Sequence, residues 1–167
     1  GLAAGSQGTM NNVLIGSEDF GVYETLGGGA GATSRGPGGS AVHVHMTNTA
    51  VTDAEVLEHR HPLRVERFAV RRGSGGSGVY RGGDGLVRAV RALQPVRLSV
   101  VTQRRDAGAP GLAGGGPGLP GRQWIERGDG STDPLAAADT ADLRAGDRLV
   151  IETPGGGGWR DTRRSEN

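Results

Sequence analysis

The sequence predicts a mainly β domain of the α+β class: an antiparallel β-sandwich or barrel-like domain with one short helix and long glycine-rich loops. Short apolar runs recur along the 167 residues and are separated by turn-forming residues. The 33 glycines and 8 prolines are clustered between these runs, as in a β-rich domain with long turns. Because aromatic residues make up only 4% of the chain, aliphatic side chains must form most of the core.

The first predicted elements are a β-hairpin, a loop and a strand. Residues 13–15 and 20–25 are short apolar runs with a Gly-Ser-Glu-Asp turn between them, which is typical of a hairpin. Residues 27–39 are rich in glycine and are expected to form a loop. Residues 42–46 alternate between apolar and histidine side chains, which predicts a strand with both histidines on one face.

One short helix is expected after this strand. Thr52 and Glu55 have the spacing of a capping box, with Thr52 as the N-cap. The helix would bury Val56 and Leu57. It would end before Pro62, because the residue that precedes a proline avoids the helical region.

The remaining predicted elements are strands and a second loop. Residues 63–70 are expected to form a strand. Its apolar positions change parity near Glu66 and Arg67, which predicts a β-bulge there. Further strands are expected at residues 78–80, 86–93, 96–101, 124–125 and 149–151. Residues 108–121 are expected to form a glycine- and proline-rich loop, residues 155–158 to end the ordered part, and residues 161–167 to form a frayed tail.

The composition excludes several classes of function. All 19 basic residues are arginine, so neither a P-loop lysine nor a Schiff-base lysine is present. The absence of cysteine excludes disulfides and thiol nucleophiles. The net charge of +1, with both signs interspersed, does not favour nucleic acid as a partner. No run has membrane-spanning length and no signal peptide pattern opens the chain, so we expect a cytoplasmic protein without a membrane partner.

The histidines are the strongest candidates for chemistry. Two imidazoles at His43 and His45 on one strand face would be close enough to share a metal or to pair with a substrate. A structural role for these two remains equally open. His59 and His61 are better explained as exposed side chains near a helix end, where positive charge interacts favourably with the helix dipole.

The glycines near residue 29 are a weaker signal. A glycine-rich loop after a strand suggests a phosphate cradle, but no helix pattern follows it, so that context fails. Close approach of the backbone to a ligand or to another domain would explain Gly28, Gly29 and Gly31 equally well.

Seven motifs in a fixed order carry a family resemblance. They are residues 6–12 (SQGTMNN), 23–32 (YETLGGGAGA), 42–49 (VHVHMTNT), 71–76 (RRGSGG), 80–85 (YRGGDG), 111–115 (GLAGG) and 152–158 (ETPGGGG). Together they resemble the hydantoinase B family, which also forms the carboxy-terminal part of 5-oxoprolinase. The resemblance covers nearly the whole chain. It implies that residues 1–160 are the carboxy-terminal part of a hydantoinase B-like domain whose amino-terminal portion is missing.

The resemblance implies an ATP-dependent hydrolase that opens cyclic amides such as 5-oxoproline or hydantoins. Members of the family act with a hydantoinase A-type ATP-binding subunit or domain, so an oligomeric complex is expected. That partner would phosphorylate the amide oxygen, and ATP would not be bound by a motif of this chain. In the related acetone carboxylases, metal ligands are expected in the amino-terminal portion that is missing here, which leaves room for a divalent metal there, and no metal ligand is assigned to this chain.

The resemblance also implies roles for individual residues. His45, with His43 and Asn48, is expected to line the reaction chamber. His45 would be the general acid or base, because an imidazole near its free pKa suits both steps. Asn48 would hydrogen-bond a substrate carbonyl. The expected substrate-binding residues are Glu24, Gly28, Gly29 and Gly31.

Two alternatives to cyclic-amide hydrolysis remain open. The chain could be a non-catalytic module that docks the ATP-binding partner and buries its glycine-rich loops. It could also belong to an enzyme that resembles acetone carboxylase and carboxylates a ketone at the expense of ATP. Dependence of ATP turnover on bicarbonate would separate carboxylation from hydrolysis.

Overall fold

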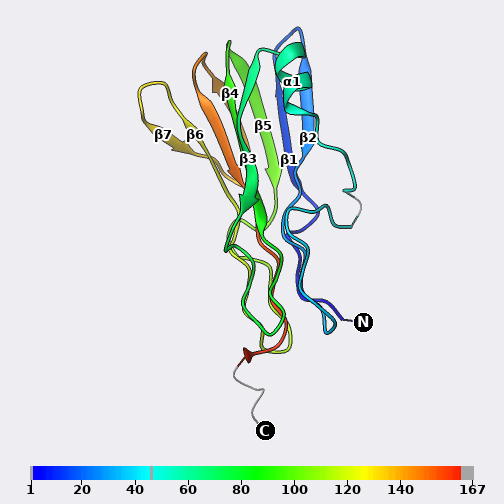
Figure 1. Cartoon of the computed structure of the whole chain (residues 1–167). Coiled ribbons are helices and arrows are strands. Elements are labelled where there is room, and N and C mark those ends of the chain that lie inside the picture. Colours follow the sequence, from blue (N-terminus) through cyan, green and yellow to red (C-terminus); the bar gives the residue numbers. More distant parts are fainter. Residues whose placement is uncertain (1, 46, 163–167) are drawn as a thin grey trace.

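The computed structural model describes residues 2–45 and 47–162, in which two antiparallel sheets pack face to face (Figure 1). One sheet has the strand order β2-β1-β5-β8 and the other has the order β3-β4-β9-β6-β7. The elements are β1 (Asn11–Gly16), β2 (Gly21–Thr25), α1 (Ala54–Arg60), β3 (Leu63–Arg71), β4 (Gly85–Ala92), β5 (Val96–Thr102), β6 (Arg122–Glu126), β7 (Thr132–Pro134), β8 (Ala138–Leu143) and β9 (Arg148–Glu152). The predicted sandwich is confirmed. The barrel alternative is wrong, because the two sheets remain separate.

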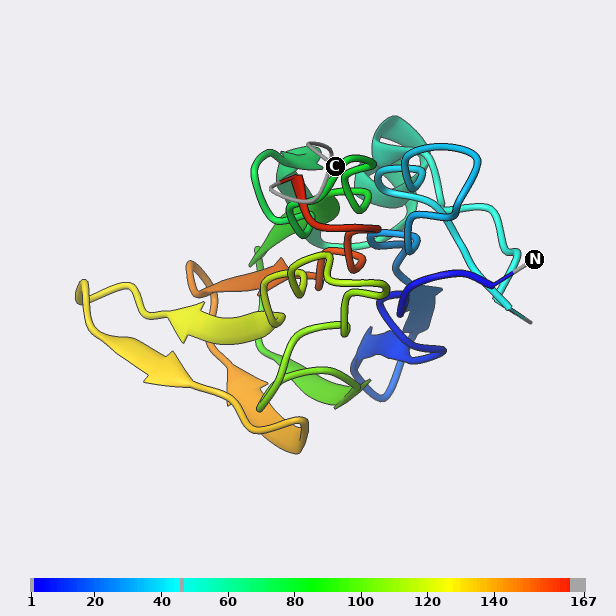
Figure 2. The ribbon, with the colours of Figure 1, turned by 90° about the horizontal axis from the view of Figure 1, so that it is seen from below.

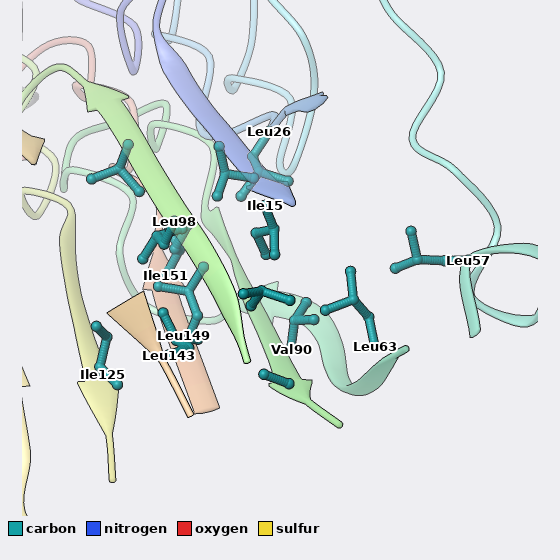
Figure 3. Packing of buried hydrophobic residues seen from close by; sticks show 14 of the residues in the cluster. Ile15, Leu26, Leu57, Leu63, Val90, Leu98, Ile125, Leu143, Leu149 and Ile151 are labelled. Atoms are coloured by element: carbon teal, nitrogen blue, oxygen red, sulfur yellow. The ribbon is translucent and has the colours of Figure 1, made fainter. Parts of the chain in front are cut away.

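The hydrophobic core lies between the two sheets. Inward-facing side chains of β1 and β5 meet those of β4 and β9 (Figure 3). Along β5, Val96, Leu98 and Val100 are buried while Arg97 is exposed, so one face of this strand points into the core. The helix adds Leu57 to the same cluster.

Most of the predicted strands are present. β1 and β2 form the predicted antiparallel hairpin. The register of β3 against β4 shifts between Val65 and Arg67, which confirms the predicted bulge. β7 and β8 were not predicted, because their residues TDP and ADTADL carry almost no large apolar side chains.

The helix begins one residue later than predicted. The carboxylate of Asp53, rather than the hydroxyl of Thr52, accepts hydrogen bonds from the amides of Glu55 (2.9 Å) and Val56 (3.4 Å). Leu57 is buried as predicted, but Val56 is 40% exposed. Within residues 2–45 and 47–162, no helix has the length and apolar character that crossing a bilayer would require.

The predicted strand at residues 42–46 is wrong. Val42 makes one isolated bridge, in which it exchanges backbone hydrogen bonds with Gly28. The backbone is not extended on either side of this bridge, since φ is +51° at Ala41 before it and +58° at His45 after it. Met46 lies outside the described residues. The two histidines of this segment therefore do not share a strand face.

Below the sandwich, five segments run side by side, four of them rich in glycine (Figures 1 and 2). We call this region the glycine bundle and define it as residues 3–7, 28–41, 74–84, 108–119 and 154–160. Residues 154–160 are its central segment, whose backbone is hydrogen-bonded to all four others: it donates to residues 3–7, accepts from residues 28–41, and does both with residues 74–84 and 108–119. The view from below shows this segment, in red, between the green and blue-cyan segments (Figure 2).

The central segment has a three-residue repeat. The amides of Gly155 and Gly158 both donate to the segment 108–119, while those of Gly156 and Trp159 both donate to the segment 74–84. A repeat of three is that of polyproline II geometry, whereas a β-strand repeats every two residues. A bundle of such segments can pack closely only if glycines face one another.

Predictions for two segments of the bundle are wrong. Residues 155–158 do not end the ordered part, because they are buried at its centre and the described chain continues to residue 162. Residues 78–80 form no strand, only a single bridge from Tyr80 to Trp159. Most of the predicted frayed tail, residues 163–167, lies outside the described residues.

Asp147 joins the β6–β7 turn to the β8–β9 turn. Its buried carboxylate accepts hydrogen bonds from the Arg127 guanidinium (2.8 Å) and from the amides of Gly128 (3.0 Å) and Arg144 (2.9 Å). Burial would raise the pKa of this carboxyl, but these donors outweigh it and hold the pKa below the ordinary 3.8.

We expect the substitution Asp147→Asn to lower the free energy of unfolding by about 1–2 kcal/mol at neutral pH, because charge-assisted hydrogen bonds are lost. A depressed pKa stabilises the fold above the ordinary 3.8, and this contribution is lost as the pH falls through the folded-state value. The free energies of unfolding of the wild-type chain and of Asp147→Asn, measured by urea denaturation, should therefore converge at acid pH. The exposed Asp19→Asn variant is the control, and an equal cost at every pH would contradict the prediction.

Candidate active site

Two motifs that are distant in sequence meet at Ser6 and His45. The Ser6 hydroxyl oxygen lies 3.0 Å from His45 Nε2, and the two residues are 39 positions apart. Ser6 belongs to the first segment of the glycine bundle, and His45 lies on the loop that follows the second segment. His45 is exposed, so its imidazole is fixed on one side and open to a reactant on the other.

His43 has a different position and a different partner. Its Nε2 lies 2.8 Å from the carbonyl oxygen of Thr25, at the end of β2. Because a carbonyl can only accept, Nε2 of His43 must carry a proton. His43 is half-buried and anchors its loop to the sandwich. The structure therefore does not bring His43 and His45 together as a pair.

Asn48 lies on the same loop as His45 and is exposed. Within the described part of the chain it makes no side-chain hydrogen bond, so its amide is available to a ligand. A hollow of about 720 Å³ lies elsewhere, between the β1–β2 turn and the start of β5. None of the predicted site residues lines it.

Glu24 is in the interior of the sandwich. Its carboxylate lies 2.9 Å from the Arg88 guanidinium of β4, and both side chains are at most 5% exposed. Phe68 covers this pair, with its ring centre 5.0 Å from the Arg88 guanidinium. Burial raises the pKa of Glu24, while the positive charge of Arg88 acts in the opposite direction. These contacts give Glu24 a structural role between the sheets.

The three predicted substrate-binding glycines lie in the bundle. A Cβ at Gly29 would overlap the carbonyl oxygen of Gly83, and one at Gly31 would overlap that of Ala4. The space beside Gly28 is filled by the side chain of Gln7. Close packing of the protein against itself accounts for all three glycines.

Sequence reasoning missed a buried polar network where the sandwich meets the bundle. Asn11 donates to the side chain of Gln7 (2.5 Å), and Arg105 donates to Asn11 (2.9 Å) and to Gln123 (2.5 Å). Burial, and then the nearby Arg71 charge, lower the pKa of Arg105 to about 10. Only Gln7 and Asn11 belong to a recognised motif, so the sequence carried no signal for the other two.

The described residues offer little for a metal ion. Across residues 2–45 and 47–162, no three His, Asp or Glu side chains lie close enough together to hold one. His45 is engaged by Ser6, and His43 donates to a carbonyl. These residues do not fit a metal centre.

Comparisons with known proteins establish the family. The sequence pattern of the hydantoinase B/oxoprolinase family matches residues 1–162. This chain belongs to that family. It is 46% identical to 5-oxoprolinase 1 of Arabidopsis thaliana over 154 residues, which cover 92% of this chain and 12% of the plant protein. It is 32% identical to caprolactamase subunit beta of Pseudomonas jessenii over 65% of this chain and 20% of that subunit.

The fold of this hydantoinase B/oxoprolinase segment matches a solved structure. The crystal structure of the ATP-dependent caprolactamase from Pseudomonas jessenii aligns with a TM-score of 0.80 at 22% identity, over 96% of this chain and 30% of that one. The chain thus spans a small part of the relatives that it matches.

Proposed function

We propose that this chain is part of an ATP-dependent hydrolase that opens a cyclic amide, with 5-oxoproline or a hydantoin as the substrate class. The 46% identity to a 5-oxoprolinase over 92% of the chain carries this proposal. A hydantoinase A-type partner binds and hydrolyses ATP, and the name of the caprolactamase beta subunit supports a complex of unlike subunits. We also propose a cytoplasmic location, where ATP is supplied to the reaction.

His45 is the residue of this chain that suits the chemistry best. Opening an activated cyclic amide requires a proton for the leaving nitrogen and removal of a proton from the attacking water. An imidazole exchanges protons near neutral pH, and that of His45 is exposed and held by Ser6. Asn48 lies on the same loop and hydrogen-bonds a substrate carbonyl.

The His45→Ala variant tests this role in the family-length protein combined with its ATP-binding partner. We expect kcat for ring opening to fall about 100-fold, the lower end of what general acid–base catalysis contributes. ADP release and ring-opened product are measured with 5-oxoproline, a hydantoin, and acetone plus bicarbonate.

His59→Ala is the matched control, because His59 is also an exposed histidine but lies in the last turn of α1. It should retain normal turnover. Normal turnover in His45→Ala would contradict the catalytic role, and ADP release that depends on bicarbonate would indicate carboxylation instead of hydrolysis.

A docking module is the second candidate function. The surface of the glycine bundle and the exposed loop with His45 would then contact the ATP-binding partner directly. Two measurements distinguish these functions: calorimetric titration of the chain with the partner, and the turnover of the His43→Ala and His45→Ala variants. Tight binding together with full turnover of both variants would favour docking.

A further inference from the structure

The two sheets of the sandwich have outer faces of different character. Across the outer face of the sheet β3-β4-β9-β6-β7, arginine and glutamate side chains of its strands form ion pairs, such as that of Arg148 with Glu66 (3.0 Å). The apolar side chains beneath these charges are buried, namely those of Val87, Ala89 and Val150. This outer face is therefore closed by its own residues and is suited to contact with water.

The outer face of the sheet β2-β1-β5-β8 lacks such a layer of charges. Side chains alternate along a strand, and among the residues that the strand register places on this face only Arg97 and Asp142 are charged. Three large side chains lie there with much of their surface in solvent: Tyr23 (63% exposed), Val101 (45%) and Leu14 (44%). Apolar side chains gathered on one exposed face mark an interaction site.

The same face is hollowed at the end where β1 turns into β2. The hollow of about 720 Å³ is lined by Leu14 and Arg97, together with Gly16 and Gly21, which lie opposite each other in the register. Apart from its chain neighbours, a Cβ at Gly21 would have a single heavy atom within 4 Å, Cδ1 of Leu14 at 4.0 Å. The space beside Gly21 is therefore open to a large side chain from outside. Such anchors, seated in pockets, supply most of the binding energy at protein interfaces.

The length of the relatives indicates what covers this face. This chain spans 12% of the plant 5-oxoprolinase and 30% of the solved caprolactamase chain, so both relatives hold much further polypeptide. Interfaces between proteins that dissociate are about as polar as the rest of the surface, whereas permanent contacts are more apolar. A face with one acid and one base among its outward side chains fits a permanent contact. A covalently linked segment also needs little affinity, because its effective concentration is high.

We propose that the outer face of the sheet β2-β1-β5-β8 is the docking surface for another segment of the same family-length hydantoinase B-like chain. A large apolar side chain of that segment fills the hollow beside Gly21. The contact is independent of the proposed reaction, since neither His45 nor Asn48 takes part in it.

Cysteine labelling tests this contact, because the chain contains no cysteine that would compete. Tyr23→Cys places a thiol on the docking surface, and Arg67→Cys places one at an exposed position on the outer face of the other sheet. Both are made in a family-length protein whose own cysteines have been replaced, without the ATP-binding partner. The thiol of Tyr23→Cys should react with a maleimide at least about tenfold more slowly than that of Arg67→Cys, since it is reached only when the contact opens.

The protection should be the same at every protein concentration. Equal rates for the two thiols overturn the proposal. Protection of Tyr23→Cys that is lost on dilution identifies a second copy as the occupant. Protection that appears only after the ATP-binding partner is added identifies that partner. Either of these outcomes also overturns the proposal.

Filling the hollow provides a second readout. The side chain of Gly21→Leu takes the place of the proposed anchor, so the protection of Tyr23→Cys should fall severalfold when both changes are combined. Gly128→Leu is the matched control, at the β6–β7 turn where a Cβ would have no neighbour within 4 Å, and it should leave the protection intact. Full protection in the presence of Gly21→Leu overturns the assignment of an anchor to the hollow.

Discussion

Replacing Gly156 with alanine is expected to lower the free energy of unfolding by more than about 4 kcal/mol, a cost that few single substitutions reach. Gly156 lies in the central segment of the glycine bundle, where its amide donates to Gly83 and its carbonyl accepts from Gly76. A Cβ at this position would overlap both the carbonyl oxygen and the carbonyl carbon of Ala30. Backbone atoms cannot rotate away as a side chain can, so a neighbouring segment must be displaced.

Urea denaturation followed by circular dichroism measures this loss, and the yield of soluble protein covers the case in which the variant does not fold. Gly36→Ala is the matched control, because no heavy atom lies within 4 Å of the position that its Cβ would take. The control should denature like the wild-type chain. Equal midpoints for the two variants would show that the bundle tolerates a side chain at its centre.

The second large effect concerns the ion pair between the sheets. Arg88→Met leaves the carboxylate of Glu24 buried without its partner, and removal of one member of a buried pair costs about 3–5 kcal/mol at neutral pH. Burial already raises the pKa of Glu24 above the ordinary 4.5, with Arg88 opposing it. Without Arg88 the pKa rises further, and the folded variant favours the protonated carboxyl.

This loss has a pH signature. A raised pKa gives stability that is fully present below the ordinary 4.5 and is lost as the pH rises through the folded-state value. Thermal denaturation of Arg88→Met should therefore show more stability near pH 4.5 than at neutral pH, relative to wild type. The double variant Arg88→Met/Glu24→Gln should recover much of the stability that Arg88→Met loses. A loss of stability in Arg88→Met that does not change with pH would refute the electrostatic explanation. Arg97→Met, at an exposed position of β5, is the control.

The sandwich could be predicted because its signals are local. The hairpin of β1 and β2, the bulge in β3 and the burial pattern of β5 follow from apolar parity and turn residues. The strand at residues 42–46 failed for the opposite reason. Its alternation is real, but Thr25, Gly28 and Ser6 hold this segment from distant parts of the chain. No periodic pattern within residues 42–46 contains those partners.

The glycine bundle could not be read from the sequence because glycine has no side chain that reveals a buried face. The sequence of a run such as residues 155–158 fits two different structures equally well, a flexible chain end and the centre of a close-packed array. The deciding groups are the carbonyls of Ser74, Ala30 and Pro110, which occupy the places of the missing side chains. For the candidate site, motifs identified His45, but its contact with Ser6 depends on the same long-range packing.

The order of the segments along the chain has a consequence for biosynthesis. The ribosome makes residues 154–160 after the four segments that surround them in the bundle. Until then, four backbone amides lack the carbonyl oxygens that accept their hydrogen bonds in the folded chain: those of Gly29, Ala32, Gly76 and Leu112. Contacts of such large sequence separation are slow to form. The nascent chain should therefore remain open and sensitive to protease on the ribosome, and become resistant in a single late step when its last segment inserts.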